Sequence, residues 1–192
     1  MNENDKPIAL REWAVAVRAL EEGRQVIVLR KGGIAEETKD FSLQSHSFYL
    51  FPSFEHQKPH LVKPEAADAL RSTQEEAASN PGSVRIASYA EVVEDIEVTD
   101  AETLKRLDDL HIWTEDYAEE RLKWKKTKPL HVLILRMYGL TAPADVPMNE
   151  TYAGCKSWLR VQEQLPSPKP YPILDDDKFA FMADNVRKAI QG

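Results

Sequence analysis

Cysteine is nearly absent from this chain of 192 residues, which contains one, Cys155. A single cysteine cannot form an internal disulfide and cannot by itself build a thiolate zinc site. Long hydrophobic runs are also missing, because the longest, at residues 131–140, is interrupted by Arg136 and falls short of the roughly 18 residues that span a bilayer. The N-terminal sequence MNENDKP is polar and acidic, unlike a signal or transit peptide. We therefore expect a cytoplasmic protein with no membrane segment.

Several enzyme signatures are missing as well. The patterns GxxxxGK[ST], GxGxxG, HExxH and GxSxG do not occur, which argues against a P-loop, a dinucleotide fold, a zincin and a hydrolase elbow. Restriction-type nucleases usually carry E-x-K on a strand, and residues 119–121 match this spacing with arginine in place of lysine, on a predicted helix. The sequence therefore assigns no metal ligands and leaves any cofactor unknown.

Charge is unevenly distributed along the chain, whose net charge is −7. Residues 91–120 contain twelve acidic and two basic side chains, and residues 121–128 contain five basic and no acidic ones. The overall negative charge argues against non-specific nucleic-acid binding by the whole surface. Both segments are typical of solvated helix faces, although the acidic face at 91–120 could also meet a basic protein partner.

Hydrophobic periodicity predicts helices and strands in mixed order. Leu10, Trp13, Val17 and Leu20 recur at helical spacing, with Gly23 placed to end the helix. Helices are predicted at residues 9–22, 65–79, 115–126 and 175–190, with a further start signal at 99–102. Strands are predicted at residues 25–29, 41–51, 83–98, 131–140 and 156–161. Prolines predict a loop at 142–147 and an extended link at 166–172.

This pattern predicts the α+β class. We expect a single domain over residues 1–192, with a mixed β-sheet or partly closed small barrel and flanking helices. The proline-rich link at 166–172 precedes a C-terminal helix that is too short to fold alone, so we expect this helix to dock onto the domain.

Five sequence pieces together resemble a known family. They are ALREWAVAVRALEEGRQVIVLRKGGI, FYLFPSFEHQ, IWTEDYAEERLKW, PLHVLILRMYGL and YAGCKSW, spread over residues 9–158. As a set they resemble a bacterial family described as a domain of unknown function, DUF1802. The resemblance implies family membership and carries over no activity, ligand or catalytic residue.

Ionisable side chains follow two predicted strands, at positions where open sheets commonly place sites. Arg30 and Lys31 precede Gly32 and Gly33. Glycines let the backbone approach a ligand, and neighbouring cations suit a phosphate or carboxylate. The structural alternative is a tight turn with solvated charges.

The segment after the second strand contains Glu55 and His56. A histidine oriented by a carboxylate can transfer protons near neutral pH, so these two residues are candidate catalytic groups. His46 and His60 lie nearby in the sequence, which raises the question of a metal site. The alternative is that the segment around Gln57 only braces a loop by hydrogen bonds.

A third group combines aromatic and basic side chains. On a helix, Tyr117, Arg121 and Trp124 share one face, and such rings beside a guanidinium can stack on bases. The alternative is that the rings pack on the sheet.

Trp113 precedes this helix, and Arg136 lies inside a buried strand, where it must pair with an acid such as Glu55 or face a pocket.

Three functions follow from these residues. The first is an anion-binding domain for a small molecule, nucleotide or single-stranded RNA, with ligand-binding residues Arg30, Lys31, Gly32, Gly33, Trp113, Arg121, Trp124 and Arg136. The second is an enzyme on a phosphate-containing substrate, possibly nuclease-like in class, with Glu55 and His56 as its acid–base pair. The third is a protein-interaction module that uses the acidic face at 91–120.

Overall fold

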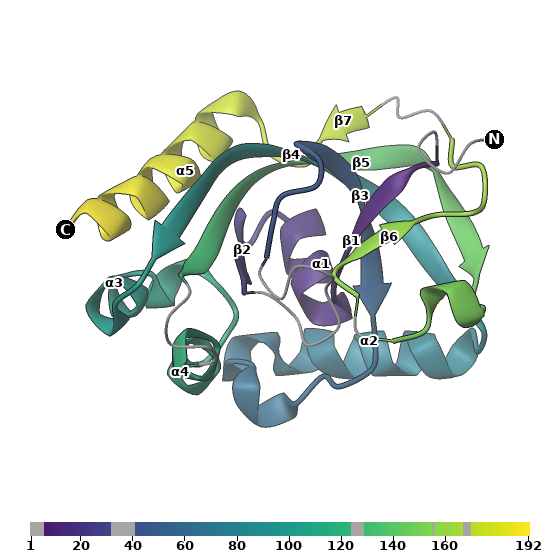
Figure 1. The fold of residues 1–192 in the computed structure, drawn as a ribbon, viewed down its shortest axis with the longest axis horizontal. Coiled ribbons are helices and arrows are strands. Elements are labelled where there is room, and N and C mark those ends of the chain that lie inside the picture. Colours follow the sequence, from purple (N-terminus) through teal and green to yellow (C-terminus); the bar gives the residue numbers. More distant parts are fainter. Residues whose placement is uncertain (1–5, 32–40, 124–128, 155, 167–169) are drawn as a thin grey trace.

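The computed structural model of the chain describes residues 6–31, 41–123, 129–154, 156–166 and 170–192 (Figure 1). They form an α+β domain in which a mixed sheet curls into a half-barrel, with helices around it and a C-terminal helix docked on it. The predicted fold class is confirmed.

Seven strands make up the described sheet. They are β1 (Ile8–Trp13), β2 (Ile27–Arg30), β3 (Ser47–Ser53), β4 (Ser83–Val98), β5 (Leu130–Pro147), β6 (Trp158–Arg160) and β7 (Pro170–Pro172). Their order is β2-β5-β4-β3-β1-β6, with β7 paired to β5. Neighbouring strands are antiparallel except β1 and β3, which are parallel.

Five α-helices surround or fill the sheet in the described residues. They are α1 (Ala14–Glu21), α2 (Ala67–Ser79), α3 (Ala101–Arg106), α4 (Glu115–Lys123) and α5 (Asp176–Gln191). Asp100 and Asp175 cap α3 and α5, because their carboxylates accept hydrogen bonds from the backbone N–H groups of Thr103 and Lys178, each at 2.8 Å. Short 3-10 turns occupy Pro59–Leu61, Pro64–Ala66, Asp108–Leu110 and Glu150–Tyr152.

The predicted helix at residues 9–22 is wrong in its first part, because β1 occupies Ile8–Trp13 and the helix begins at Ala14. Figure 1 shows β4 and β5 arching over α1, with α2 along the open side of the arch. Six of the eight residues of α1 are buried. The helix therefore lacks the polar face by which a sequence pattern distinguishes a helix from a buried strand. Gly23 ends the helix as predicted, with φ at 66° and its N–H bonded to the carbonyl of Leu20.

The parallel pair β1 and β3 places two strand ends at the same edge of the sheet. Trp13 at the end of β1 pairs with Ser53 at the end of β3. The segment after β3 returns to α1, because the Gln57 side-chain oxygen accepts a hydrogen bond from the N–H of Val15 at 2.9 Å. The carboxyl ends of both strands therefore open beside the start of α1.

The predicted loop at residues 142–147 is wrong, because β5 continues to Pro147. The register between β4 and β5 shifts between Ile86 and Ser88, whose partners are Ala144 and Gly139. Residues 140–143 therefore have no partner on β4 in this ladder, and Pro143 removes no ladder hydrogen bond there. The sheet bends at this irregularity.

The C-terminal helix α5 lies outside the arch formed by β4 and β5 (Figure 1). Arg187 on α5 pairs with Glu94 on β4 at 2.5 Å, and Val186 and Ala183 are buried against the main core. In the part of the chain that the structure describes, no helix is long and apolar enough to cross a membrane.

Candidate functional site

A cleft of about 210 Å³ lies where the carboxyl ends of β1 and β3 meet the end of β2 and the helix α4. Ligand sites often occupy the carboxyl ends of parallel strands. The side chains around the cleft come from segments far apart in the sequence. Its lining consists of Arg11, Glu12, Trp13, Arg30, Lys31, Ser53, Glu55, His56, Arg121, Gly154, Lys156 and Ser157.

Arg30, the last residue of β2, is held rigidly at the cleft and is 7% exposed. One terminal nitrogen donates to the Glu12 carboxylate at 3.0 Å, and the other donates to the Ser157 hydroxyl at 2.5 Å. Its Nε is buried without a hydrogen-bond partner among the described residues. The bonds of its two terminal nitrogens therefore fix the Arg30 guanidinium in place beside the cleft.

Lys31 and Arg121 add two further cations to the lining of the cleft. The Lys31 ammonium donates to the carbonyl of Leu122 at 2.6 Å, which ties the end of β2 to α4. Burial lowers the pKa of Lys31 from its ordinary value. Arg121 lies over the Tyr117 ring at 5.1 Å, as expected for neighbours on one face of α4. Tyr117 is 3% exposed and belongs to the main core, so its ring packs inside the protein, as the structural alternative predicts.

Arg11 joins the cleft to the segment before β6. Its guanidinium donates to the backbone carbonyls of Tyr152 and Gly154 and lies over the Phe51 ring at 5.5 Å. Gly154 has a φ of 87°, a conformation that other residues rarely adopt. Arg11 therefore fixes the wall of the cleft that leads to Lys156 and Ser157.

Glu55 and His56 form the exposed rim of the cleft. His56 has a φ of 63°, which is uncommon for a residue with a side chain. Gln57 is buried and bonded to the backbone of α1 and to Thr73. The bracing role expected for this segment therefore belongs to Gln57, whereas Glu55 and His56 are positioned at the cleft.

The cleft is positively charged although the protein is acidic. Five cationic side chains and two carboxylates line it, a local balance of +3 with His56 neutral, against a net charge of −7 for the chain. The Glu12 carboxylate already accepts hydrogen bonds from Arg30 and from the backbone N–H of Trp13. The remaining cations give the cleft a positive potential suited to an anion.

The structure brings five of the predicted site residues together and leaves others apart. Arg30, Lys31, Glu55, His56 and Arg121 all line the cleft. Gly32, Gly33 and Trp124 lie outside the described residues.

Trp113 and Arg136 do not line the cleft. Trp113 is 1% exposed and packs on two other rings. Its ring centroid lies 5.2 Å from that of Trp13 and 4.2 Å from that of Tyr117. It supports Trp13, which does line the cleft. Arg136 pairs with Asp176 of α5 at 2.6 Å, rather than with the buried acid that its strand position suggested. We therefore omit Trp113 and Arg136 from the proposed site.

The remaining histidines and acids are dispersed. Within the described ranges, no three His, Cys, Asp or Glu side chains gather to hold a metal ion. The acidic residues of 91–120 lie on β4, α3, α4, the N-cap of α3 and the 3-10 turn Asp108–Leu110, and several have intramolecular partners. These pairs are Glu94 with Arg187, Asp95 with His131, Asp108 with Lys63, and Glu115 with Lys105.

Sequence reasoning misses Arg11, Lys156 and Ser157 as site residues. Arg11 and Glu12 interrupt an apolar segment, IALREW, and a charged pair inside such a strand is a signal that could have identified them. Lys156 and Ser157 come from the far end of the sequence, and only the pairing of β6 with β1 brings them to the cleft.

Comparison with known proteins identifies the family. The model of the family described as domain of unknown function (DUF1802) matches residues 9–185. The chain belongs to this family, which confirms the resemblance carried by its sequence pieces. No curated protein and no solved structure gives a significant match to the chain.

Proposed function

We propose that this member of the DUF1802 family binds an anionic ligand of the nucleotide or single-stranded RNA class. The phosphate would lie in the cleft between Arg30, Arg121 and Lys156. The observation that carries this proposal is the convergence of five cationic side chains in one cleft of an otherwise acidic protein. Guanidinium groups suit phosphate because their planar donors can form paired, charge-assisted hydrogen bonds.

The burial of Arg30 supports this role. A buried guanidinium with a buried carboxylate partner is weak evidence for stability, because desolvation offsets much of the attraction. A ligand phosphate would add negative charge beside Arg30, at a site with a positive balance.

Titration with inorganic phosphate and with short labelled single-stranded RNA tests the proposal. Arg121→Ala should weaken binding of both by about ten-fold, because one charge-assisted hydrogen bond is lost, and added salt should weaken RNA binding further. The matched control is Arg71→Ala, since Arg71 is an exposed helical arginine that does not line the cleft. Absence of binding at low salt would contradict the proposal, as would equal losses in the two variants.

An enzyme on a phosphate-containing substrate is the second candidate. Glu55 and His56 both line the cleft, and the backbone of His56 lies in the left-handed region, where strain often accompanies function. Product analysis after incubation with nucleotides and RNA tests it. His56→Ala should then abolish turnover and retain phosphate binding, whereas His60→Ala, which alters an exposed histidine outside the cleft, should retain both. Turnover that survives His56→Ala would exclude this assignment.

A further inference from the structure

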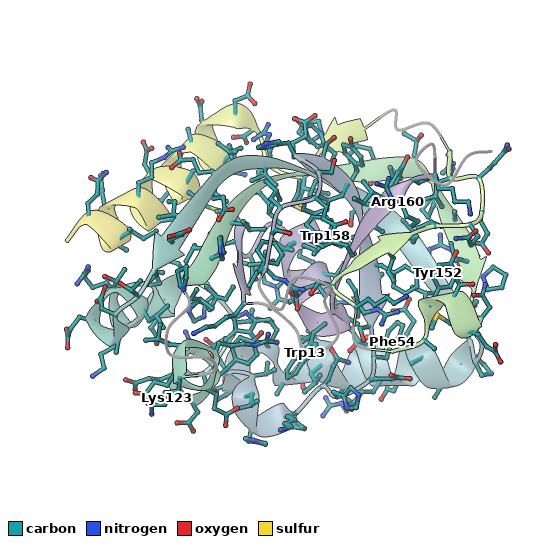
Figure 2. All side chains as sticks on the ribbon, in the orientation of Figure 1. Trp13, Phe54, Lys123, Tyr152, Trp158 and Arg160 are labelled. Carbon is teal, nitrogen blue, oxygen red and sulfur yellow. The ribbon has the colours of Figure 1, made fainter. Side chains whose placement is uncertain are left out.

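A second cavity, of about 320 Å³, adjoins the cleft. It lies between the end of β3, the end of α2, the start of β4 and the segment before β6. The two spaces share four lining residues, Arg11, Ser53, Glu55 and Gly154. In the view of Figure 2, Phe54 lies between Trp13 of the cleft and Tyr152 of the cavity. The cleft and the cavity are therefore direct neighbours, separated by these shared residues.

The cavity differs from the cleft in its chemistry. Among the described residues that line it, charge is carried by the shared Arg11 and Glu55, and these two charges cancel. Three aromatic residues line it, Phe51, Phe54 and Tyr152. Phe51 and Tyr152 are each 1% exposed, so Phe54, which is partly exposed, is the ring on which a flat uncharged group can stack.

Polar side chains at the cavity can read the edge of such a ring. Asn80, Ser83 and Asn149 line the same space, and amide side chains both donate and accept hydrogen bonds. Nucleobases present donors and acceptors along their edges. The cavity therefore combines one ring for stacking, that of Phe54, with the polar groups that a base requires.

Arg11 marks the junction of the two spaces. Its bonds to the carbonyls of Tyr152 and Gly154, and its position over the Phe51 ring, hold the cavity wall and the cleft wall in one arrangement. A ligand that spans the junction would pass this fixed guanidinium.

We infer that the ligand is a nucleoside monophosphate, with its phosphate in the cleft and its base in the adjoining cavity. This inference rests on the proposed anion-binding function. The sizes agree with it, because small-molecule pockets typically occupy about 300–1,000 Å³. The cleft alone is smaller than this range, whereas cleft and cavity together fall within it. One cavity with one set of aromatic walls matches a single nucleotide better than a longer strand.

Calorimetric titration with five probes tests the inference. The probes are inorganic phosphate, ribose 5-phosphate, a purine and a pyrimidine nucleoside 5′-monophosphate, and a single-stranded RNA hexamer. At least one nucleoside monophosphate should bind about ten-fold or more tightly than ribose 5-phosphate, because base stacking is added. The hexamer should bind no more tightly than the preferred monophosphate.

Variants of Phe54 separate the two parts of the site. Phe54→Ala should weaken binding of the preferred monophosphate about ten-fold and leave the affinity for inorganic phosphate unchanged. Phe54→Leu, which keeps apolar volume and removes the ring, gives the same test if the alanine variant is poorly folded, as judged by its melting temperature. Phe181→Ala is the matched control, because Phe181 is 67% exposed on α5.

The outcomes distinguish this inference from the proposed function. Equal affinity for ribose 5-phosphate and the nucleoside monophosphates would overturn the inference but would still support an anion site. Tighter binding of the hexamer would also overturn it, by showing that the ligand is a strand and not a mononucleotide. Loss of phosphate binding in Phe54→Ala would also overturn the division into two subsites. Failure of every probe to bind would remove the proposed function as well.

Discussion

Arg30 and Arg136 lie on the neighbouring strands β2 and β5, and both are less than 10% exposed. Their partners differ. Arg30 bonds to Glu12, whose side chain is 2% exposed, whereas Arg136 pairs with Asp176, whose side chain is 98% exposed. Arg136 also lies over the Phe179 ring at 4.7 Å. One arginine is enclosed at the cleft, and the other attaches a helix to the outside of the sheet.

Burial of a charged residue in a strand therefore does not by itself identify a site. Both arginines occupy apolar segments, VIVLR and VLILRMY, and both satisfy the expectation that a buried cation needs a partner. The difference lies in position along the strand, because Arg30 ends β2 at the cleft whereas Arg136 lies within β5 beneath α5. Variants of Arg30 and Arg136 test this contrast, and acidification tests a third buried side chain, His111.

The largest effect is expected for Arg30→Met. This change leaves the Glu12 carboxylate buried without its cation, and breaking a buried pair in this way typically costs roughly 3–5 kcal/mol. Denaturation by urea should therefore show a free energy of unfolding lower by about that amount. Phosphate binding by the folded variant should be lost as well.

The double variant Glu12→Gln/Arg30→Met is the control for this pair. Neutralising Glu12 removes the unpaired charge, so the double variant should be more stable than Arg30→Met alone. If the loss of stability in the double variant equals the sum of the losses in Glu12→Gln and Arg30→Met, the two residues are not coupled. Arg30 would then not differ from Arg136 in depending on a buried partner.

An intermediate loss of stability is expected on acidification, through the buried side chain of His111. Burial, with Lys63 nearby, lowers the pKa of His111 from 6.5 to about 4. The unfolded chain therefore binds a proton first as the pH falls, and stability decreases between about pH 6.5 and pH 4. Through this residue, the free energy of unfolding should fall by about 2 kcal/mol between pH 7 and pH 5.

His111→Asn should remove this part of the pH dependence. The asparagine oxygen can accept the hydrogen bond that His111 Nδ1 accepts from the N–H of Trp113 at 3.2 Å. His46→Asn is the matched control, since His46 is exposed, and it should keep the wild-type profile. If the His111 variant loses stability on acidification as the wild type does, His111 is not the responsible group.

The smallest effect is expected for Arg136→Met. The partner carboxylate is exposed and stays solvated after the change, so the loss of stability should be about 1 kcal/mol, mainly from the contact with Phe179. Hydrogen exchange should increase in α5, and phosphate affinity should remain at the wild-type value.

Asp176→Asn separates the ion pair from the ring contact. It should change stability less than Arg136→Met does, because it removes the exposed partner and keeps Arg136 over Phe179. A large loss of phosphate affinity in either variant would place Arg136 in the binding site and remove the distinction from Arg30.

Much of the fold could be predicted because its strands are apolar and continuous. Phe48 to Phe51 and Val132 to Leu135 are buried on both faces of the sheet, which such runs indicate. The boundary between β1 and α1 could not be predicted, because Leu10 and Val17 are both buried in one cluster and their spacing imitates one helix face.

The candidate site was partly predictable for a different reason. Arg30, Lys31, Glu55 and His56 directly follow strands, so the sequence places them at strand ends. Their convergence is not encoded locally, because it depends on the parallel pairing of β1 with β3 and on the return of β6 beside β1. No periodicity within any one segment reports such pairings.

The position of β1 between β3 and β6 has a consequence for synthesis of the protein. β1 is made before β3 and β6, yet its edge toward β6 is paired only when Trp158 to Arg160 has left the ribosome. Until then β1 presents an open edge of backbone donors and acceptors, the type of edge that invites pairing with other chains. Ser157, the hydroxyl partner of Arg30, arrives with the same segment. The nascent chain therefore completes its cleft and closes its exposed edge in one late step.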